Sequence, residues 1–173
     1  MVRFIPYDPA SHRVQLLELN IEFITFIANQ MLVHHNIDAE VHGGGQTIQE
    51  YVKIHLDKFT KIRPPKGIIY IVESEGKTIG MGALSPLDKG VGEIKRMYIR
   101  PEYRGKGIGR TLLTKLLNKA KEFGYTSLCL ESQDFMTVAH KLYKSMGFQE
   151  TDAYPSRETP DWYPYNLYMK INL

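Results

Sequence analysis

The sequence has only one cysteine, Cys129, among its 173 residues. A single cysteine excludes a disulfide within the chain and is typical of proteins in a reducing compartment. The first residues lack the apolar run and the small-residue cleavage site of a secretory signal peptide. No stretch approaches the roughly 20 consecutive apolar residues that span a bilayer. We therefore expect a cytoplasmic protein without a membrane partner.

The chain also has little excess charge of either sign. It contains 22 Lys and Arg against 19 Asp and Glu, for a net charge of +3. This balance does not indicate a nucleic-acid partner, and no array of stacking aromatics accompanies the basic residues. With 43% hydrophobic and 24% charged residues, the composition is that of a soluble globular protein. The length predicts one domain covering residues 1–173.

Two further sequence patterns resemble functional sites but lack residues that those sites need. His34, His35 and His42 have no carboxylate pair at ligand spacing, so we predict no metal site. His42 and the three glycines at 43–45 match the oxyanion loop of some esterases, but the chain has no G-x-S-x-G nucleophile motif. This glycine-rich loop is therefore either a mobile loop over a binding site or a plain connector.

The most informative stretch runs from Val91 to Gly124. Residues 91–99 suit an extended strand, which Pro101 ends, and apolar residues at helical spacing follow from 108 to 120. Between them, glycines allow several backbone N–H groups to converge, and a helix N-terminus favours an anion such as phosphate. The turn contains three basic residues and three glycines: Arg104, Gly105, Lys106, Gly107, Gly109 and Arg110.

The spacing of these glycines separates the turn from two other phosphate-binding loops. A Walker loop needs a Gly-Lys-Ser/Thr triplet, which is absent, and a dinucleotide fingerprint needs G-x-G-x-x-G. Here Arg104 to Gly109 reads R-x-x-G-x-G directly after a strand, which resembles the coenzyme A signature of the GNAT superfamily of N-acyltransferases. Residues 139–148 also resemble that family's A-x-x-L-Y-x-x-x-G-F segment. Two ordered motifs are more specific than either one alone.

The remaining sequence predicts secondary structure in the order of that family's fold. We expect seven strands, at residues 2–7, 67–74, 77–84, 91–99, 127–132, 148–154 and 162–171. We expect four helices: the first is capped by Ser11 and runs to about residue 36, the second spans 47–62, the third runs from 108 to a stop at Gly124, and the fourth spans 137–146. The fold class is therefore α/β (α+β): a single-domain GNAT fold with a mixed central sheet of about seven strands and helices on both faces.

The first predicted helix is more apolar than a one-faced surface helix requires. Its surplus apolar surface is either core, a wall of the substrate site or a subunit contact, which leaves a homodimer open. We expect the acceptor groove to be built from the first two helices, the glycine-rich loop and residues 155–165.

The resemblance implies direct transfer of an acetyl group from acetyl-CoA to an amine of a small molecule or a peptide. It implies that Glu93, by its place in an E-I-x-x-x-x-I run, is the general base and that Tyr143 is the general acid for the departing thiolate. If they have no catalytic role, Glu93 is a solvated carboxylate on a strand and Tyr143 is an aromatic residue packed on a helix. The residues expected to bind coenzyme A, the first three through their backbone, are Met97, Tyr98, Ile99, Arg104, Gly105, Lys106, Gly107, Ile108, Gly109 and Arg110.

Other readings stay open at this point. A non-catalytic acyl-CoA-binding or sensory module on the same fold is the alternative function. Cys129 has no evident activating partner, so we interpret it as a small core residue rather than an acyl-accepting nucleophile. Met136 stands where the family often has Asn, and Ser132, Gln133 or Asp134 could replace that contact to the pantetheine arm.

Overall fold

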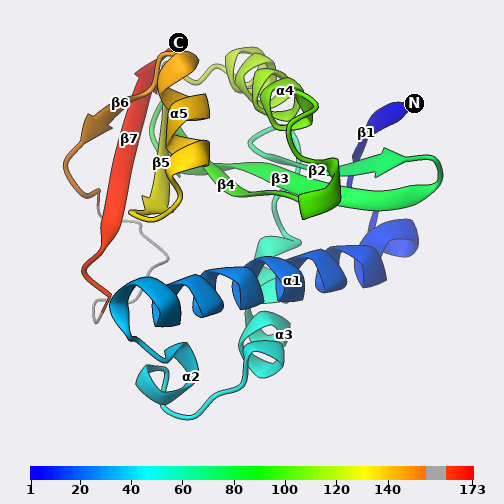
Figure 1. Ribbon diagram of the computed structural model, residues 1–173. Helices are drawn as coiled ribbons and strands as arrows, with labels where there is room; N and C mark the ends of the chain where they lie inside the picture. Colours follow the sequence, from blue (N-terminus) through cyan, green and yellow to red (C-terminus); the bar gives the residue numbers. More distant parts are fainter. Residues whose placement is uncertain (155–162) are drawn as a thin grey trace.

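The computed structural model describes residues 1–154 and 163–173, and a seven-stranded sheet forms its centre (Figure 1). The strand order is β1-β2-β3-β4-β5-β7-β6. Strands β4 and β5 pair in parallel, and the other described neighbours pair antiparallel. This sheet confirms the predicted fold class. The strands are β1 (Val2–Pro6), β2 (Ile68–Ser74), β3 (Lys77–Asp88), β4 (Val91–Ile99), β5 (Ser127–Gln133), β6 (Gln149–Thr151) and β7 (Asn166–Asn172).

Helices cover both faces of the sheet. Helices α1 and α3 lie on one side, and α4 and α5 lie on the other (Figure 1). The core is divided accordingly: Leu112 and Leu116 of α4 pack with Leu128 on one face, and Leu16 of α1 packs with Met81 on the other. The helices are α1 (Pro9–His35), α2 (Ala39–His42), α3 (Ile48–Phe59), α4 (Ile108–Glu122) and α5 (Thr137–Ser145), with a short 3₁₀ helix, η1 (Pro101–Tyr103).

The helix starts follow from their capping residues. Helix α1 begins at Pro9, whose fixed φ suits the first helical position, and Asp8 is its N-cap. The prediction that Ser11 caps this helix is wrong, because Asp8 Oδ2 accepts a hydrogen bond from the backbone N–H of Ser11 at 3.1 Å. In α3, Thr47 and Glu50 form the predicted capping box.

Helix α1 contributes to the core with one part and to a cavity with another. By length and composition alone it is apolar enough to cross a membrane. In the fold, however, its first half buries Leu16, Leu19 and Asn20 completely. Ile27 and Met31 from its second half line the cavity described below. The apolar surplus predicted for this helix is therefore divided between core packing and a cavity wall.

The C-terminal strands are shorter than predicted. Strand β6 spans only Gln149–Thr151, and β7 begins at Asn166. Tyr163 and Tyr165, which were expected in the last strand, precede it. Their rings pack against His35 at the end of α1, with ring centroids 6.0 and 3.8 Å away. This packing joins the segment to α1 rather than to the sheet.

Candidate functional site

Strands β4 and β5 part halfway along β4. Their parallel ladder spans four residue pairs, from Val91 opposite Ser127 to Ile94 opposite Leu130. Beyond this point β4 continues to Ile99, while the rest of β5 pairs with β7. The facing backbone edges of the two strands therefore have no ladder between them there, and an opening forms inside the sheet.

A β-bulge in β4 determines which side chains lie beside the opening. Arg96 has a φ of +50°, in the left-handed region, and the register between β3 and β4 shifts by one residue at this point. Because a bulge interrupts the alternation of side chains, Lys95 and Arg96 both lie on the face covered by α1 and α3. Lys95 pairs with Ala83 on that face, and the Arg96 guanidinium lies 4.7 Å from the ring centroid of Phe59 in α3.

The glycine-rich turn has the backbone geometry that its sequence predicts. Gly105 and Gly107 have φ values of +75° and +76°, and a Cβ at either position would meet nothing within 4 Å. Gly107 is the N-cap of α4, and no described side chain caps this helix end. The first N–H groups of α4 are thus suited to an anion. Gly109 differs: its Cβ would lie 3.6 Å from Leu142, so it serves the packing of α4 against α5.

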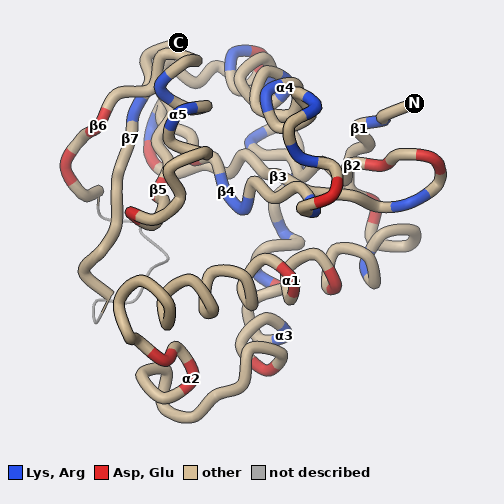
Figure 2. Tube along the Cα trace, in the orientation of Figure 1, with Lys and Arg blue, Asp and Glu red and all other residues tan. Residues whose placement is uncertain are grey.

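The three basic side chains of the turn point in different directions. Arg104 Nε donates to the backbone oxygen of Ile99 at 2.7 Å, which folds this side chain back towards β4. Arg110 Nη2 donates to Ser145 Oγ at 2.8 Å and links α4 to α5. Lys106 is exposed. Figure 2 shows that basic residues follow the turn and continue along α4. Their contacts to coenzyme A stay predictions.

The other residues predicted to bind coenzyme A differ in whether their side chain or only their main chain can contact a ligand. Met97 lines the cavity between the parted strands. Tyr98 packs in the core on the α1 side, and Ile99 and Ile108 pack in the core on the α4 side. Since these three side chains are buried, only their main-chain groups are placed to meet a ligand.

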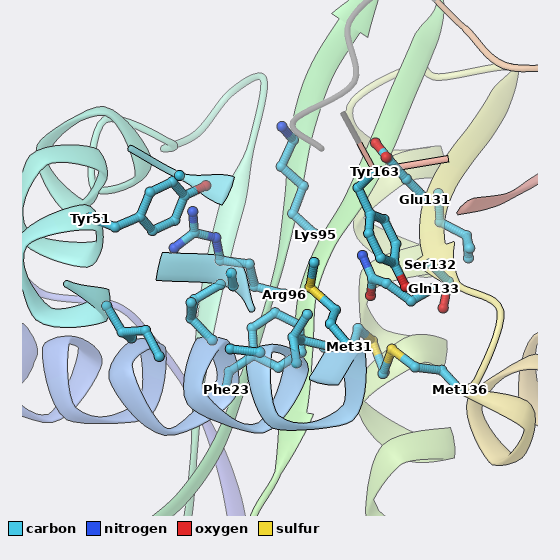
Figure 3. Close-up of a pocket in the computed structure, with 18 of the residues that line it drawn as sticks. Phe23, Met31, Tyr51, Lys95, Arg96, Glu131, Ser132, Gln133, Met136 and Tyr163 are labelled. Carbon is cyan, nitrogen blue, oxygen red and sulfur yellow. The ribbon is translucent and has the colours of Figure 1, made fainter. Parts of the chain in front are cut away.

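A cavity of about 400 Å³ opens where β4 and β5 part (Figure 3). Glu93 and Tyr143, the two predicted catalytic residues, both line it. They come from different faces of the sheet, since Glu93 precedes the bulge on the α1 side and Tyr143 packs in the α4-side core. The side wall from α1 is apolar and consists of Phe23, Ile24, Ile27, Ala28 and Met31.

Glu93 is buried, with 3% of its surface exposed, and two donors hold its carboxylate. Tyr154 Oη donates to Oε1 at 2.7 Å, and Lys95 Nζ lies 2.8 Å from Oε2. Burial, and then the neighbouring carboxylate, raise the pKa of Tyr154 well above its ordinary value, so its phenol stays protonated and remains a donor. Glu93 is therefore not the solvated strand carboxylate of the alternative reading.

Tyr143 is buried on α5, and its ring packs near Phe148 with centroids 6.0 Å apart. Burial raises the pKa of Tyr143 to about 12, because the phenolate would lose its hydration. The residue therefore belongs to the core and to the cavity wall at once. At neutral pH it is a phenol, so it can donate a hydrogen bond or its proton.

The end of β5 supplies the polar groups near the expected pantetheine position. Ser132 and Gln133 line the cavity, and Ser132 Oγ lies 3.0 Å from Nε2 of the buried His140. Asp134 instead binds His35 Nε2 at 2.8 Å and holds the end of α1. Of the three replacements considered for the missing asparagine, Ser132 and Gln133 are thus the two at the cavity.

Cys129 lies directly opposite Glu93 on β5 and is buried. Burial raises the pKa of its thiol, so the reactive thiolate is disfavoured. This agrees with the interpretation of Cys129 as a core residue. In the part of the chain that the structure describes, no three His, Cys, Asp or Glu side chains gather in a way that could hold a metal ion.

The segment after α1 forms another part of the cavity wall. Asp38 Oδ1 caps the four-residue helix α2 by accepting the backbone N–H of Glu40 at 3.0 Å. Glu40 and Gly43 line the cavity together with Tyr51 of α3. The first helices and the glycine-rich loop therefore border the cavity, and their role as the acceptor groove stays a prediction. Trp162, which was predicted to contribute as well, lies outside the described residues.

Four residues at this site escaped the sequence analysis: Tyr51, Lys95, Arg96 and Tyr154. The consecutive Lys95 and Arg96 inside a strand were a usable signal, because a regular strand would place them on opposite faces. Tyr154 left no such signal, since it lies 61 residues from Glu93 in the sequence.

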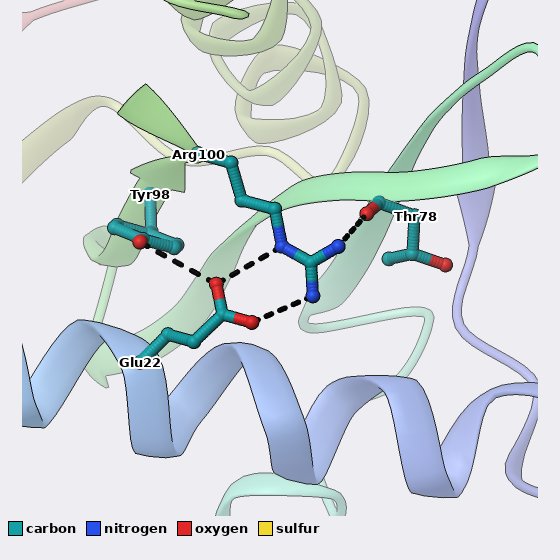
Figure 4. A network of polar contacts seen from close by, with 4 residues as sticks. All are labelled: Glu22, Thr78, Tyr98 and Arg100. Carbon is teal, nitrogen blue, oxygen red and sulfur yellow. Dashed lines mark hydrogen bonds and ion pairs between the residues drawn. The ribbon is translucent and has the colours of Figure 1, made fainter. Parts of the chain in front are cut away.

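A half-buried ion pair fixes α1 against β4 beside the site (Figure 4). Glu22 Oε1 lies 2.6 Å from Arg100 Nη2, and Oε2 accepts from Arg100 Nε at 3.0 Å. Arg100 Nη1 also donates to the backbone oxygen of Thr78 at 2.8 Å. The two parallel contacts fix the orientation of both groups. This pair therefore sets the distance between the apolar cavity wall and β4.

Arg100→Met is expected to lower the free energy of unfolding by about 1–2 kcal/mol, because it removes the donor to the Thr78 oxygen and leaves the half-buried Glu22 carboxylate with only the long contact from Tyr98 Oη at 3.5 Å. Urea denaturation measures this change. Arg13→Met is the matched control, since Arg13 binds Asp57 across α1 and α3 at 2.8 Å but both side chains are mostly exposed. If both variants lose the same free energy of unfolding, the half-buried pair of Glu22 and Arg100 stabilises the fold no more than an exposed pair does.

Comparison with known proteins adds the following findings. The sequence profile of the Acetyltransferase (GNAT) family matches residues 32–148. A protein of Escherichia coli K12 named uncharacterized N-acetyltransferase YjgM is 32% identical over 156 residues, which cover 88% of this chain and 89% of that protein. An acetyltransferase of the GNAT family from Staphylococcus aureus Mu50 has a similar structure, with a TM-score of 0.72, 22% identity and 99% of each chain covered. PaiA N-acetyltransferase from Thermoplasma acidophilum, solved in complex with coenzyme A, has a TM-score of 0.70 and 16% identity, with 100% of this chain and 99% of that chain covered.

Proposed function

Because the chain belongs to the GNAT family of acetyltransferases, we propose that it transfers an acetyl group from acetyl-CoA directly to an amine, with Glu93 as general base and Tyr143 as general acid. One observation carries this proposal. A buried carboxylate and a buried phenol line a single cavity at the point where β4 and β5 part. These are the two proton-transfer groups that aminolysis of a thioester needs.

Acetyl-CoA would extend from the glycine-rich turn into the opening of the sheet. The N–H groups at the start of α4 and the positive charges of the turn favour its pyrophosphate. The pantetheine arm fits the opening, where the β4 backbone beyond Ile94 has no ladder with β5. A backbone N–H near Met97 would polarise the thioester carbonyl as charge develops on its oxygen. The PaiA protein, which has this fold, was solved with coenzyme A bound.

Glu93 would take the proton from the acceptor. An alkylammonium ion cannot attack the thioester until it loses a proton, because its lone pair is occupied. Tyr154 and Lys95 each engage one carboxylate oxygen, but each oxygen has a second lone pair that can accept a further hydrogen bond. The two donors thus hold the carboxylate in place without blocking its role as base.

Tyr143 would assist the departing sulfur. Because burial raises the pKa of Tyr143 to about 12, its phenol is protonated when the amine attacks and can donate to the sulfur. This hydrogen bond strengthens as negative charge develops on the sulfur, and Tyr143 acts as general acid by passing its proton to the departing thiolate. The carbon–sulfur bond breaks, the acetyl group stays on the amine, and the coenzyme A thiol leaves with the proton of Tyr143, which solvent then replaces.

The test of this proposal is release of the coenzyme A thiol from acetyl-CoA in the presence of amines, amino acids, polyamines, aminoglycosides or peptides. We expect at least one acceptor to release thiol well above the rate of hydrolysis. Binding of coenzyme A without release for any acceptor would favour the non-catalytic module. That alternative has one observation in its favour, because both oxygens of Glu93 are already engaged.

Glu93→Gln is expected to lower kcat/KM in the same assay by about 10²-fold, since the amide cannot accept the amine proton. The affinity for coenzyme A should stay the same. Glu131→Gln is the matched comparison, because Glu131 is the neighbouring carboxylate of the cavity on β5. A larger loss in Glu131→Gln, with Glu93→Gln nearly intact, would assign the base to Glu131.

A further inference from the structure

A second hollow, of about 840 Å³, adjoins the cavity on the α3 side of the sheet. The two share four lining residues: Tyr51, Glu93, Lys95 and Arg96. We infer that the amine acceptor carries a carboxylate that binds in this basic hollow while its amino group reaches Glu93. This inference rests on the proposed function and adds the chemical class of the acceptor.

The charge of the hollow is the first observation behind this inference. Glu93 is the only carboxylate among its described lining residues, whereas six cationic side chains line it together with His55. Such an excess of one sign attracts an oppositely charged ligand and raises its local concentration. The six come from the end of α3, the segment that follows it and β4, and are Lys58, Lys61, Arg63, Lys66, Lys95 and Arg96.

This hollow is separate from the glycine-rich turn. Helix α3 covers the face of the sheet opposite to α4, whose N-terminus the turn precedes (Figure 1). The positive charges of the hollow are therefore not needed for the pyrophosphate of acetyl-CoA. They lie on the other side of the candidate base, where the acceptor has to approach.

The position of Arg96 is the second observation. The bulge in β4 turns its side chain towards α3, where it extends in the direction of Tyr51 (Figure 3). Arg96 Nη1 donates a short hydrogen bond to Asn20 Oδ1, and its guanidinium lies 4.7 Å from the ring centroid of Phe59. Asn20 itself is fully buried and donates from Nδ2 to the backbone oxygen of Leu16 at 2.7 Å. A guanidinium held in this way loses little entropy when it binds a carboxylate.

The hydroxyl of Ser85 is the third observation. Ser85 lies directly opposite Glu93 on β3 and lines the hollow, with 6% of its surface exposed. Its Oγ has no hydrogen-bond partner among the described residues. A buried hydroxyl without a partner is costly, and a polar group bound in the hollow would remove that cost.

These features select among amines. A polyamine or an aminoglycoside would bring several positive charges against those of the hollow, and this repulsion opposes binding. An amine with a carboxylate is oriented instead, because the cations attract its acidic part and Glu93 attracts its ammonium group. A free amino acid and an acidic peptide N-terminus share this chemistry, and the hollow is large enough for either.

The experiment compares acceptors that differ only in charge, with thiol release from acetyl-CoA as the readout. L-leucine is paired with L-leucinamide, and a peptide with three aspartates after its first residue is paired with one carrying three lysines. We expect kcat/KM to be at least tenfold higher for the acidic member of one pair, which also distinguishes the two sources. This preference should shrink as the salt concentration rises, because salt screens the attraction.

Variants connect the preference to the hollow. Arg96→Gln should raise KM for the preferred acidic acceptor about tenfold and leave KM for acetyl-CoA unchanged. Lys58→Gln should also raise KM for the acidic acceptor, and because Lys58 is exposed, this effect does not depend on the packing of Arg96. Lys77→Gln is the control, because Lys77 is exposed at the far end of the β2–β3 hairpin and should change neither KM.

Each outcome decides one of the two claims. Turnover of neutral or polycationic amines without any preference for the acidic partners would overturn the inference and leave the proposed function standing. A greater preference for phosphoethanolamine than for β-alanine would also overturn it, because phosphate would then be the anion. If no amine is acetylated, the binding of N-acetyl-L-leucine to the complex with coenzyme A tests the hollow separately. Binding that Arg96→Gln weakens would support a carboxylate site in the basic hollow although the proposed function fails. If N-acetyl-L-leucine does not bind, both claims are rejected.

Discussion

Replacing Tyr143 with phenylalanine is expected to lower kcat by about 10²- to 10³-fold, with KM for acetyl-CoA nearly unchanged. The substitution removes one hydroxyl and keeps the ring that packs near Phe148. The loss should appear in kcat because the hydrogen bond to sulfur strengthens only as the thiolate forms. Steady-state thiol release with saturating acetyl-CoA measures it, and the unfolding midpoint confirms that the core is intact.

The pH profile gives an independent check on Tyr143. Since burial raises its pKa to about 12, the phenol stays protonated throughout an assay between about pH 6 and 10. A loss of activity on the alkaline side in that range would have to come from another group and should persist in Tyr143→Phe. If the alkaline limb vanishes in this variant, the pKa of Tyr143 is lower than its burial predicts, and if kcat is unaffected, Tyr143 is not the acid proposed here.

Gly107→Val is expected to weaken coenzyme A binding by more than 100-fold while the protein still folds. Gly107 combines a φ of +76° with an open surrounding, so a side chain there meets no protein atom but strains the backbone. It would also project from the N-cap of α4 and hinder access to the N–H groups expected to hold the pyrophosphate. Calorimetric titration with coenzyme A measures the affinity directly.

The same helix provides a matched control for this variant. Gly124, just after α4, has a φ of +81° and likewise nothing within 4 Å of its Cβ position. Gly124→Val should therefore cause a similar loss of stability, from the same backbone strain. Its coenzyme A affinity should stay normal, because it lies at the opposite end of the helix. Equal affinities in the two variants would remove the turn from the binding site.

Local sequence signals predicted most of the fold because they act over short distances. The proline and glycines around α4 and the capping box at Thr47 each fix a backbone position. Their elements appear where expected, within a few residues. The prediction of Ser11 as a cap failed for the same local reason, because Asp8 satisfies that amide from three residues earlier.

Features that depend on contacts between distant segments were not predictable from the sequence. The bulge at Arg96 depends on the register of β4 against β3, and Tyr154 reaches Glu93 only because the chain returns to β4 after β6. Tyr163 and Tyr165 have the alternation of a strand, yet aromatic packing on His35 holds them outside it. Of the residues that the resemblance predicted, Glu93, Met97 and Tyr143 line the cavity, and tertiary contacts determine which groups hold them there.

The short ladder between β4 and β5 has a consequence for solubility. Unpaired strand edges are hazardous at the rim of a sheet, because any other chain can add a strand to them and start aggregation. Here the two edges without a ladder lie inside the sheet, between neighbours β3 and β7 and beneath the helices that cover both faces. The parting of β4 and β5 therefore adds no edge to the outer edges of the sheet, β1 and β6, at which another copy could pair.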